Sequence, residues 1–155
     1  MIRLALVALL SVACATGPEL RAMPMSRQEI LLYGTRHYRA TPNEVYKAAL
    51  GALRALNYEI ANESPDKGVI VSARKVVRVA GVVWGGQVLT HSRQYVLRLF
   101  TDAESHDVVV SALPKVFEGD REVSAQPVWN LEDERRLWRE LFAQMDLVVT
   151  PAAPR

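Results

Sequence analysis

The sequence predicts an α+β domain in which a curved antiparallel sheet of about four or five strands carries two helices on one face, a helix-grip-like arrangement. Apolar residues recur at helical spacing in two segments, one after Thr41 and one after Asn130. Between these segments, short stretches of alternating apolar and polar residues are joined by turn sequences. The length of 155 residues suits a single hydrophobic core.

A short strand is expected near residues 35–39, followed by the first helix. Thr41 can cap the free backbone amides of this helix, and Glu44 can return a hydrogen bond to the cap. Pro42 suits the first helical position, where its missing amide would have no partner. Asn57 can adopt the left-handed conformation that ends a helix. The apolar residues at helical spacing between these ends are Val45, Ala49, Ala52, Leu53 and Leu56.

Three turns are expected to join antiparallel strands. In residues 64–68, Pro65 presets its backbone angle and Gly68 can accept a positive φ. Further turns are expected at residues 85–86 and at residues 102–107. The strands joined in this way are 58–63 with 69–71, 76–84 with 87–89, and 94–100 with 108–113.

Core-facing side chains are predicted from two periodicities. In the strand before the third turn, Tyr95, Leu97 and Leu99 alternate with the residues at 94, 96 and 98, which favours a sheet with one face buried more completely than the other. A second helix, capped by Asn130, has an acidic first turn at residues 132–134 that complements the helix dipole and is expected to face solvent. Its apolar stripe consists of Leu131, Trp138, Leu141, Phe142 and Met145.

The N-terminal segment resembles the lipobox signal peptide of a bacterial lipoprotein. Arg3 precedes the apolar run of residues 4–10, and the small side chain of Ala13 lies directly before Cys14, the only cysteine in the chain. The resemblance implies cleavage before Cys14 and attachment of lipid to its sulfur. The predicted organisation is a signal peptide at 1–13, a lipidated N-terminus and tether at 14–25, a single α+β domain at 26–150 and a disordered tail at 151–155.

This resemblance also implies a location. A lipidated Cys14 would anchor the protein to a membrane, which is then its first partner. Ala15 stands where an aspartate retains lipoproteins of enteric bacteria in the inner membrane, so the resemblance implies a periplasm-facing position on the outer membrane. The inner membrane, the cell surface and an ordinary signal peptide with an incidental cysteine are the alternatives. A transmembrane helix is disfavoured, because spanning needs about 20 apolar residues and this run ends at Gly17 and Pro18.

A second resemblance concerns the domain. Residues 38–75 read YRATPNEVYKAALGALRALNYEIANESPDKGVIVSARK, with a polar strand, a capped helix, an aromatic residue that opens a strand, an Asp-x-Gly turn and an apolar strand. This order resembles the C-terminal modules of the C subunit of the outer-membrane β-barrel assembly machinery, which implies a helix-grip fold. Residues 81–86 depart from the pattern. The resemblance lies in structural positions and implies no active site.

Composition and motifs argue against nucleic acid binding and against catalysis. Without residues 1–13 the formal charge falls from +2 to +1, and Lys and Arg form no cluster of the kind that binds phosphate. The chain contains no Gly-x-Ser-x-Gly elbow, and lipidation would consume its only thiol, so covalent nucleophilic catalysis has no visible machinery. We therefore expect neither enzymatic activity nor a cofactor. Paired carboxylates for glycoside hydrolysis are the third-ranked alternative, because their separation depends on the fold.

The three histidines do not have the spacing of a zinc site. His37, His91 and His106 form neither an i, i+4 pair nor an HExxH motif. His106 has acidic neighbours at 102, 104 and 107, which leaves two interpretations, a divalent-metal site or a hairpin tip. Turns collect such residues because these residues tolerate turn geometry and water. We expect the hairpin tip and no bound metal.

The segment around Val82, Val83 and Trp84 is the main candidate contact surface. It is too rich in glycine for an ordinary core strand, and it places apolar side chains beside a turn, where they could contact lipid or a protein partner. The alternative is a twisted hairpin that packs Trp84 onto the core. Basic residues at 74, 75 and 78 could direct the tip towards anionic groups, or could simply solvate a strand face.

These observations lead to two functional hypotheses. The first is a membrane-anchored, non-enzymatic interaction or assembly-accessory module of the bacterial envelope, with an envelope protein as a possible second partner. The second is a carrier of lipid or another apolar ligand, held between the last helix and the curved sheet. The sequence predicts no volume for such a cavity, so the sequence alone does not decide between the two hypotheses.

Overall fold

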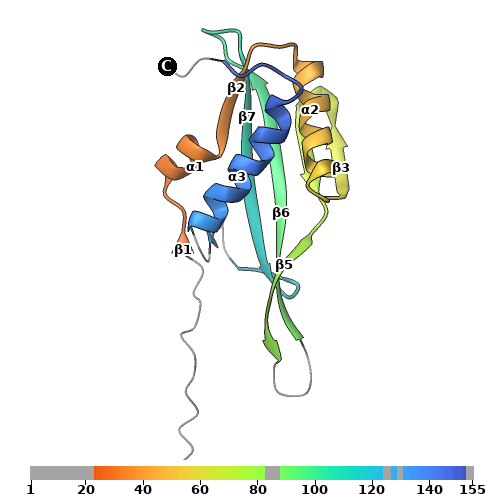
Figure 1. Cartoon of the computed structure of the whole chain (residues 1–155), viewed down its shortest axis with the longest axis vertical. Helices are drawn as coiled ribbons and strands as arrows, with labels where there is room; N and C mark the ends of the chain where they lie inside the picture. Colours follow the sequence, from red (N-terminus) through yellow and green to blue (C-terminus); the bar gives the residue numbers. More distant parts are fainter. Residues whose placement is uncertain (1–22, 83–87, 124–126, 129–130, 153–155) are drawn as a thin grey trace, which may run out of the picture.

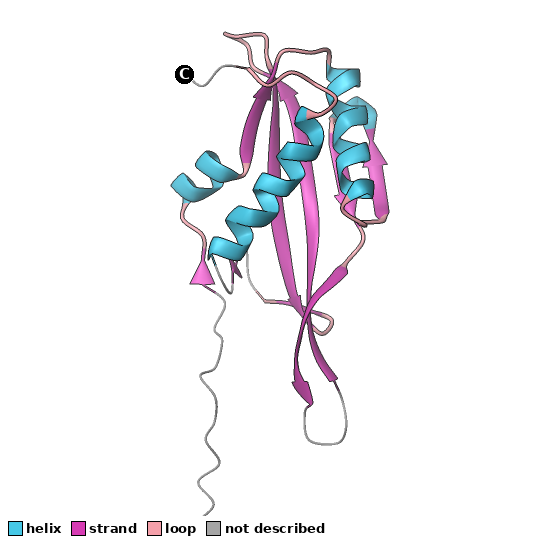
Figure 2. Ribbon diagram, viewed as in Figure 1, coloured by secondary structure: helices cyan, strands magenta, loops and turns pink. Residues whose placement is uncertain are grey.

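The computed structural model describes residues 23–82, 88–123, 127–128 and 131–152. It confirms the α+β class, with helices packed against an antiparallel sheet (Figure 1, Figure 2). The strands are β1 (Met23–Pro24), β2 (Thr35–Tyr38), β3 (Ile60–Ser64), β4 (Val69–Ser72), β5 (Lys75–Val82), β6 (Val88–Thr101), β7 (Val108–Glu118), β8 (Arg121–Glu122) and β9 (Pro127–Val128). The helices are α1 (Arg27–Tyr33), α2 (Pro42–Ala55), the 3-10 turn η1 (Pro65–Lys67) and α3 (Leu131–Asp146).

The main sheet has the order β2-β7-β6-β4-β3, with β8 beside the end of β7. The long strand β6 pairs with β7 along one edge. Along its other edge, the N-terminal half of β6 pairs with β5 and the C-terminal half pairs with β4. The β5–β6 hairpin therefore continues past the helices as a projecting arm (Figure 1). β1 and β9 form a separate two-stranded sheet.

The core lies between the sheet and the two long helices. Leu53 of α2 and Leu141 of α3 are fully buried in the same cluster as Tyr95 and Leu97 of β6. On β6 the predicted alternation is confirmed, because Tyr95, Leu97 and Leu99 are buried while Arg98 is exposed. Trp138, Phe142 and Met145 of the predicted apolar stripe are also buried.

The first predicted helix is confirmed at both ends. The Thr41 hydroxyl accepts a hydrogen bond from the Glu44 amide, and the Glu44 carboxylate accepts one from the Thr41 amide at 2.9 Å. Pro42 is the first helical residue. Asn57 has a φ of 59°, and its left-handed backbone turns the chain towards β3.

Two predicted turns are confirmed as well. Gly68 has a φ of 60°, and a Cβ atom at this position would come within 2.2 Å of the Leu99 carbonyl oxygen, so the turn packs closely on β6. At the other hairpin, the Asp102 carboxylate accepts hydrogen bonds from the Glu104 and Ser105 amides, and His106 has a φ of 60°. The turn expected at residues 85–86 and the predicted cap Asn130 lie outside the described residues.

The structure contains elements that the sequence analysis did not predict. Residues 23–24, expected to belong to an irregular tether, form β1, and Met25 is buried. α1 follows, opened by a reciprocal cap between Ser26 and Glu29. At the C-terminal end, Pro151 pairs with Tyr38, so the beginning of the expected disordered tail is bound to β2. The described part of the chain therefore has three α-helices rather than two, and its main sheet has more strands than expected.

Candidate functional site

Of the predicted contact residues, the structure describes only Val82, which lies on the projecting arm formed by β5 and the start of β6. Val82 ends β5 and pairs with Val88 of β6. Val83 and Trp84 lie outside the described residues, as does the predicted lipidation residue Cys14. At the base of the arm a bulge interrupts the pairing, and the side chains of Val76 and Val77 are both exposed, at 56% and 39%. The arm therefore presents apolar surface before its end is reached.

The two ends of the molecule differ in what they present. β1, where the described chain begins, lies at the same end as the projecting arm (Figure 1). The start of α2, the turn η1 and the β6–β7 hairpin lie at the opposite end.

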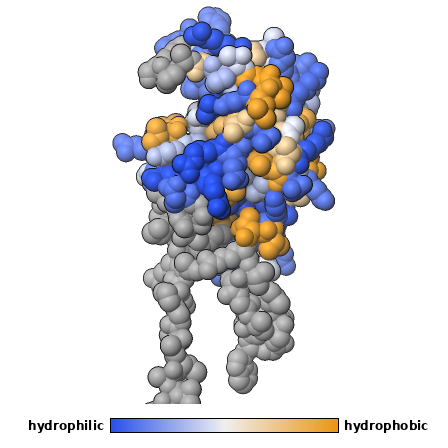
Figure 3. Space-filling model, in the orientation of Figure 1, coloured by the Kyte–Doolittle hydropathy of each residue, from blue (hydrophilic) through white to orange (hydrophobic). Residues whose placement is uncertain are grey.

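In the view of Figure 3, apolar residues form separate patches on a largely hydrophilic surface. The exposed large apolar side chains of the helical layer include Leu31 and Leu32 of α1.

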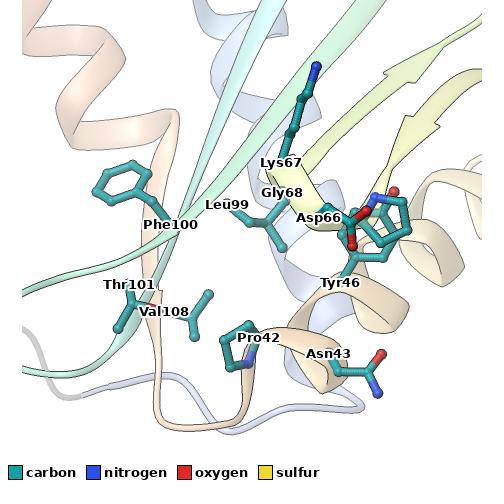
Figure 4. Close-up of a pocket in the computed structure, with 11 residues that line it drawn as sticks. Pro42, Asn43, Tyr46, Asp66, Lys67, Gly68, Leu99, Phe100, Thr101 and Val108 are labelled. Carbon is teal, nitrogen blue, oxygen red and sulfur yellow. The ribbon is translucent and has the colours of Figure 1, made fainter.

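A pocket of about 360 Å³ lies between the start of α2, η1 and the end of β6, at the end opposite the arm (Figure 1), and Figure 4 shows its lining residues. Leu99, Val108 and Pro42 lie on one side of it. Tyr46 and Asp66 lie on the other. The pocket thus combines apolar walls with a polar rim, which is the composition of many ligand and peptide sites.

The walls of this pocket are held in place by the fold. The Tyr46 hydroxyl donates a hydrogen bond to the Val69 carbonyl at 3.3 Å, which fixes the ring against β4. Burial raises the pKa of Tyr46, and the nearby Glu63 carboxylate adds to this effect. Pro42 and Pro65 have fixed φ angles, so the pocket is largely preformed.

A second unusual feature is a buried ion pair between α3 and β6. The Arg93 guanidinium contacts the Glu134 carboxylate, and both side chains are buried. Glu134 lies in the acidic first turn that was expected to face solvent, so that prediction is wrong for this residue. The reason is helical spacing, because Glu134 is four residues before Trp138 and shares its inward face. Glu132 is exposed, as expected.

Two tyrosines surround this ion pair. The rings of Tyr58 and Tyr95 meet edge to face, with centroids 5.3 Å apart. Burial raises the pKa of both hydroxyls; the charge of Glu134 adds to this effect, and the charge of Arg93 opposes it. Lys75, which was expected to solvate the strand or direct the arm, instead donates to the Leu56 carbonyl at 2.7 Å and lies over the Tyr58 ring. This cluster joins α2, α3 and the sheet, and we assign it a structural role.

The histidines remain separate in the fold. His37 is exposed on β2, whereas His91 is buried on β6, with its Nε2 3.7 Å from a Glu118 carboxylate oxygen. His106 lies at the β6–β7 turn. Within the described residues, no group of three His, Cys, Asp or Glu side chains could hold a metal ion.

Comparison of the chain with known protein families and with curated proteins finds no match. In the described part of the chain, no helix is both long enough and apolar enough to cross a membrane.

Sequence reasoning missed both the pocket and the ion pair, for different reasons. The pocket brings together the start of α2, the η1 turn and the end of β6, and no local pattern relates these three segments. The ion pair, in contrast, could have been predicted from two positions in the sequence. Arg93 shares the inward parity of Tyr95 and Leu97, and Glu134 shares the helical face of Trp138. A charge at an inward position of each element indicates a buried pair.

Proposed function

We propose that the protein is a membrane-anchored, non-enzymatic interaction module of the bacterial envelope, held at the periplasmic face of the outer membrane through lipid on Cys14. The observation that carries this proposal is the position of the two ends. β1 lies within the predicted tether of residues 14–25, at the end of the helical body from which the arm projects (Figure 1). An anchor at Cys14 would therefore place the arm beside the bilayer and direct the pocket away from it.

The arm has the chemistry that this orientation requires. Val76 and Val77 are exposed, and the predicted contact residues Val82, Val83 and Trp84 continue the apolar sequence. Apolar and indole side chains are favoured at the boundary between water and lipid. The apolar arm then supports the lipid anchor as a second point of contact.

The alternative function, a carrier of lipid or another apolar ligand, receives less support. The space between α3 and the sheet was the expected ligand cavity. Trp138, Leu141 and Met145 of α3 are buried there in the same packed cluster as Leu97 of β6. A carrier of this design would need those side chains to move apart, so we favour the interaction module.

The orientation is tested with single introduced cysteines. Because Cys14 is the only natural cysteine and lipid would occupy its sulfur, Val82→Cys and Asn43→Cys each supply one free thiol for a fluorescent label. In lipidated protein reconstituted into vesicles with nitroxide-labelled phospholipid, the label at position 82 should be quenched more strongly than the label at position 43. Equal quenching, or stronger quenching at position 43, would contradict the orientation.

The choice between module and carrier is tested by purifying the lipidated protein in mild detergent. A protein partner that copurifies in a fixed ratio supports the module. One extractable lipid molecule per protein, in addition to the covalent anchor, supports the carrier instead. Mass spectrometry of the intact complex and of its organic extract distinguishes the two results.

A further inference from the structure

Strand β6 extends beyond the end of its neighbour β4. The first residue of β4, Val69, pairs with Arg98. Phe100 and Thr101, the last two residues of β6, continue to pair with β7 on their other side. Among the described residues, no strand therefore pairs with the C-terminal end of the β6 edge that faces η1.

The backbone of Thr101 points towards this open edge. The Leu99 amide points away from β7 and donates to the Gly68 carbonyl at 2.7 Å, whereas the Asp102 amide donates across the hairpin to Asp107 at 2.9 Å. Amide and carbonyl groups of successive residues in a strand point to opposite sides. Thr101 therefore directs its amide and carbonyl to the same side as Leu99, and the described residues provide no hydrogen-bond partner for them there.

The open edge borders the pocket described above. Thr101 is one of the pocket residues, and the deeper walls are formed by Leu99, Val108 and the Tyr46 ring (Figure 4). A volume of about 360 Å³ is near the lower end of the range for ligand sites. This size suits an apolar side chain and leaves little room for a whole lipid.

The rim of the pocket carries a negative charge, which favours a positively charged group on the occupant. Asp66 and Asn43 line the pocket and are exposed. No side-chain hydrogen bond or ion pair links the Asp66 carboxylate to another described residue. Lys67 also lines the pocket, but its side chain extends away from the other residues (Figure 4). An occupant that carries a basic residue beside its apolar side chain would complement Asp66.

From these features we infer that the pocket binds an extended peptide segment of a partner protein. An apolar side chain of the peptide fills the pocket, its backbone pairs with the Thr101 amide and carbonyl, and a neighbouring Lys or Arg approaches Asp66. The peptide takes the line that β4 would follow beyond Gly68, which is strand addition to an open edge. This inference rests on the proposed function, because it names the kind of partner that the module receives.

The pocket requires little rearrangement to accept such a segment. Tyr46 is tied to Val69, and the rings of Pro42 and Pro65 limit motion of the backbone around the pocket. Preorganised sites lose less conformational entropy on binding. Because a single residue provides the open backbone edge, the interaction should be weak and should depend strongly on the apolar side chain.

The experiment selects peptides from a phage-displayed library of random nine-residue sequences on the full mature protein in detergent. Selected peptides should share an apolar residue with a Lys or Arg within two positions. A synthetic peptide of the consensus sequence is then measured by fluorescence anisotropy. Asn43→Trp, which covers the entrance with a large ring, and Asp66→Lys should each weaken binding about tenfold or more. Glu59→Lys, the same charge change on an exposed residue outside this pocket, should leave affinity unchanged.

Hydrogen exchange tests the strand pairing directly, because a peptide that only contacts Asp66 at the rim of the pocket would not protect the Thr101 amide. The consensus peptide should slow exchange of the Thr101 amide about tenfold or more, because strand pairing protects it. Circular dichroism melting checks the fold of each variant. If Asn43→Trp unfolds, Asp66→Lys and the exchange measurement still decide the question.

Three results would overturn the inference. The first is that the selected peptides share no apolar residue with a Lys or Arg nearby. The second is that neither Asn43→Trp nor Asp66→Lys weakens binding of the consensus peptide. The third is that the peptide does not change hydrogen exchange of the Thr101 amide. Variants that convert a dimer to a monomer, without any peptide binding, would identify a second copy of the chain as the occupant instead. The Cys14→Ser protein should bind the peptide normally. Failure of the anchor and failure of the peptide site are therefore separate results.

Discussion

Tyr95 and Trp138 occupy similar positions in the core but differ in how their polar atoms are satisfied. The Trp138 Nε1 group donates to the Ala112 carbonyl at 3.1 Å, and the indole stacks on Tyr33 with centroids 6.3 Å apart. The Tyr95 hydroxyl is buried without a hydrogen-bond partner among the described residues. The two side chains therefore lead to opposite expectations for stability.

Tyr95→Phe should leave the free energy of unfolding unchanged or raise it by up to about 1 kcal/mol, because an unsatisfied buried hydroxyl costs free energy in the folded state. The ring, which carries the contact with Tyr58, is retained. Urea denaturation monitored by circular dichroism measures the change. A clear loss of stability would show that the hydroxyl has a partner, such as a buried water molecule.

Trp138→Ala should lower the free energy of unfolding by about 3–5 kcal/mol, because removal of a large buried ring leaves a cavity. Trp138→Phe keeps an aromatic ring against Tyr33 but loses the hydrogen bond, and should cost about 1–2 kcal/mol. The control is Arg136→Ala on the exposed side of the same helix, expected to stay within about 0.5 kcal/mol of wild type. Equal denaturation midpoints for Trp138→Ala and Arg136→Ala would contradict the assigned inner face of α3.

The helix α3 is fixed to the sheet by a polar contact near each of its ends. Near its start, Glu134 pairs with Arg93 inside the core. At its last residue, Asp146 accepts hydrogen bonds from Arg36 at 2.6 Å and from the Tyr38 hydroxyl at 3.1 Å. The apolar stripe between these points supplies burial, and the two polar contacts set the position of the helix along the sheet.

Glu134→Leu should destabilise the protein by about 3–5 kcal/mol, because Arg93 would then be a buried charge without its counterion. The double variant Arg93→Met with Glu134→Leu removes both charges and should recover most of that loss. Chemical denaturation of the two single variants and of the double variant gives the coupling free energy. Additive effects in this cycle would argue against direct pairing in the core.

The sequence predicts those elements whose signals are local. α2 was predicted because its cap, its proline and its apolar face agree. The second half of β6 was predicted as a strand at residues 94–100 because its alternation is regular, whereas residues 87–89 were expected to form a separate strand. β1 was missed because Gly17 and the prolines at positions 18 and 24 indicated a tether up to residue 25. α1 falls inside the predicted domain and was missed although the cap between Ser26 and Glu29 was present in the sequence. This helix has no fully buried residue and depends on tertiary contacts such as the Tyr33–Trp138 stack.

The candidate pocket could not be predicted in this way. Pro42 and Pro65 each have a local explanation, as the start of a helix and as part of a turn, and neither explanation implies that they line one pocket. Their proximity follows from the register of β3, β4 and β6, which long-range packing determines. The absence of a strand beside Thr101 likewise depends on where β4 begins.

For the whole molecule, buried tyrosines give stability a predictable dependence on pH. Burial raises the pKa of Tyr38, Tyr58 and Tyr95 above the ordinary value. Below about pH 10 tyrosine is neutral in both the folded and the unfolded chain, so this contribution to stability is fully present. As the pH rises above that value, only the unfolded chain releases these protons readily, and stability falls.

Thermal unfolding should therefore show a falling melting temperature between about pH 9.5 and pH 11. Tyr95→Phe should make the decline shallower, because one raised tyrosine pKa is removed. Differential scanning calorimetry on both proteins across this range measures the two slopes. Identical slopes would show that Tyr95 does not contribute to the pH dependence.

The proposed anchor at Cys14 would place the arm beside the membrane and the pocket at the opposite end of the molecule (Figure 1). Cys14→Ser should release the protein from the membrane fraction without changing its fold, because the proposal makes lipid on this sulfur the attachment. Cell fractionation with immunodetection measures the release, and a Cys14→Ser protein that stays in the membrane fraction would contradict the anchor.

The lipid anchor is tested directly by intact mass spectrometry of the protein isolated from membranes of its native host. We expect an N-terminus at Cys14 and an added mass that corresponds to diacylglyceryl and acyl groups on that residue. Digestion should assign this mass to the N-terminal peptide. An unmodified Cys14, or a mature chain that begins at another residue, would contradict the central claim.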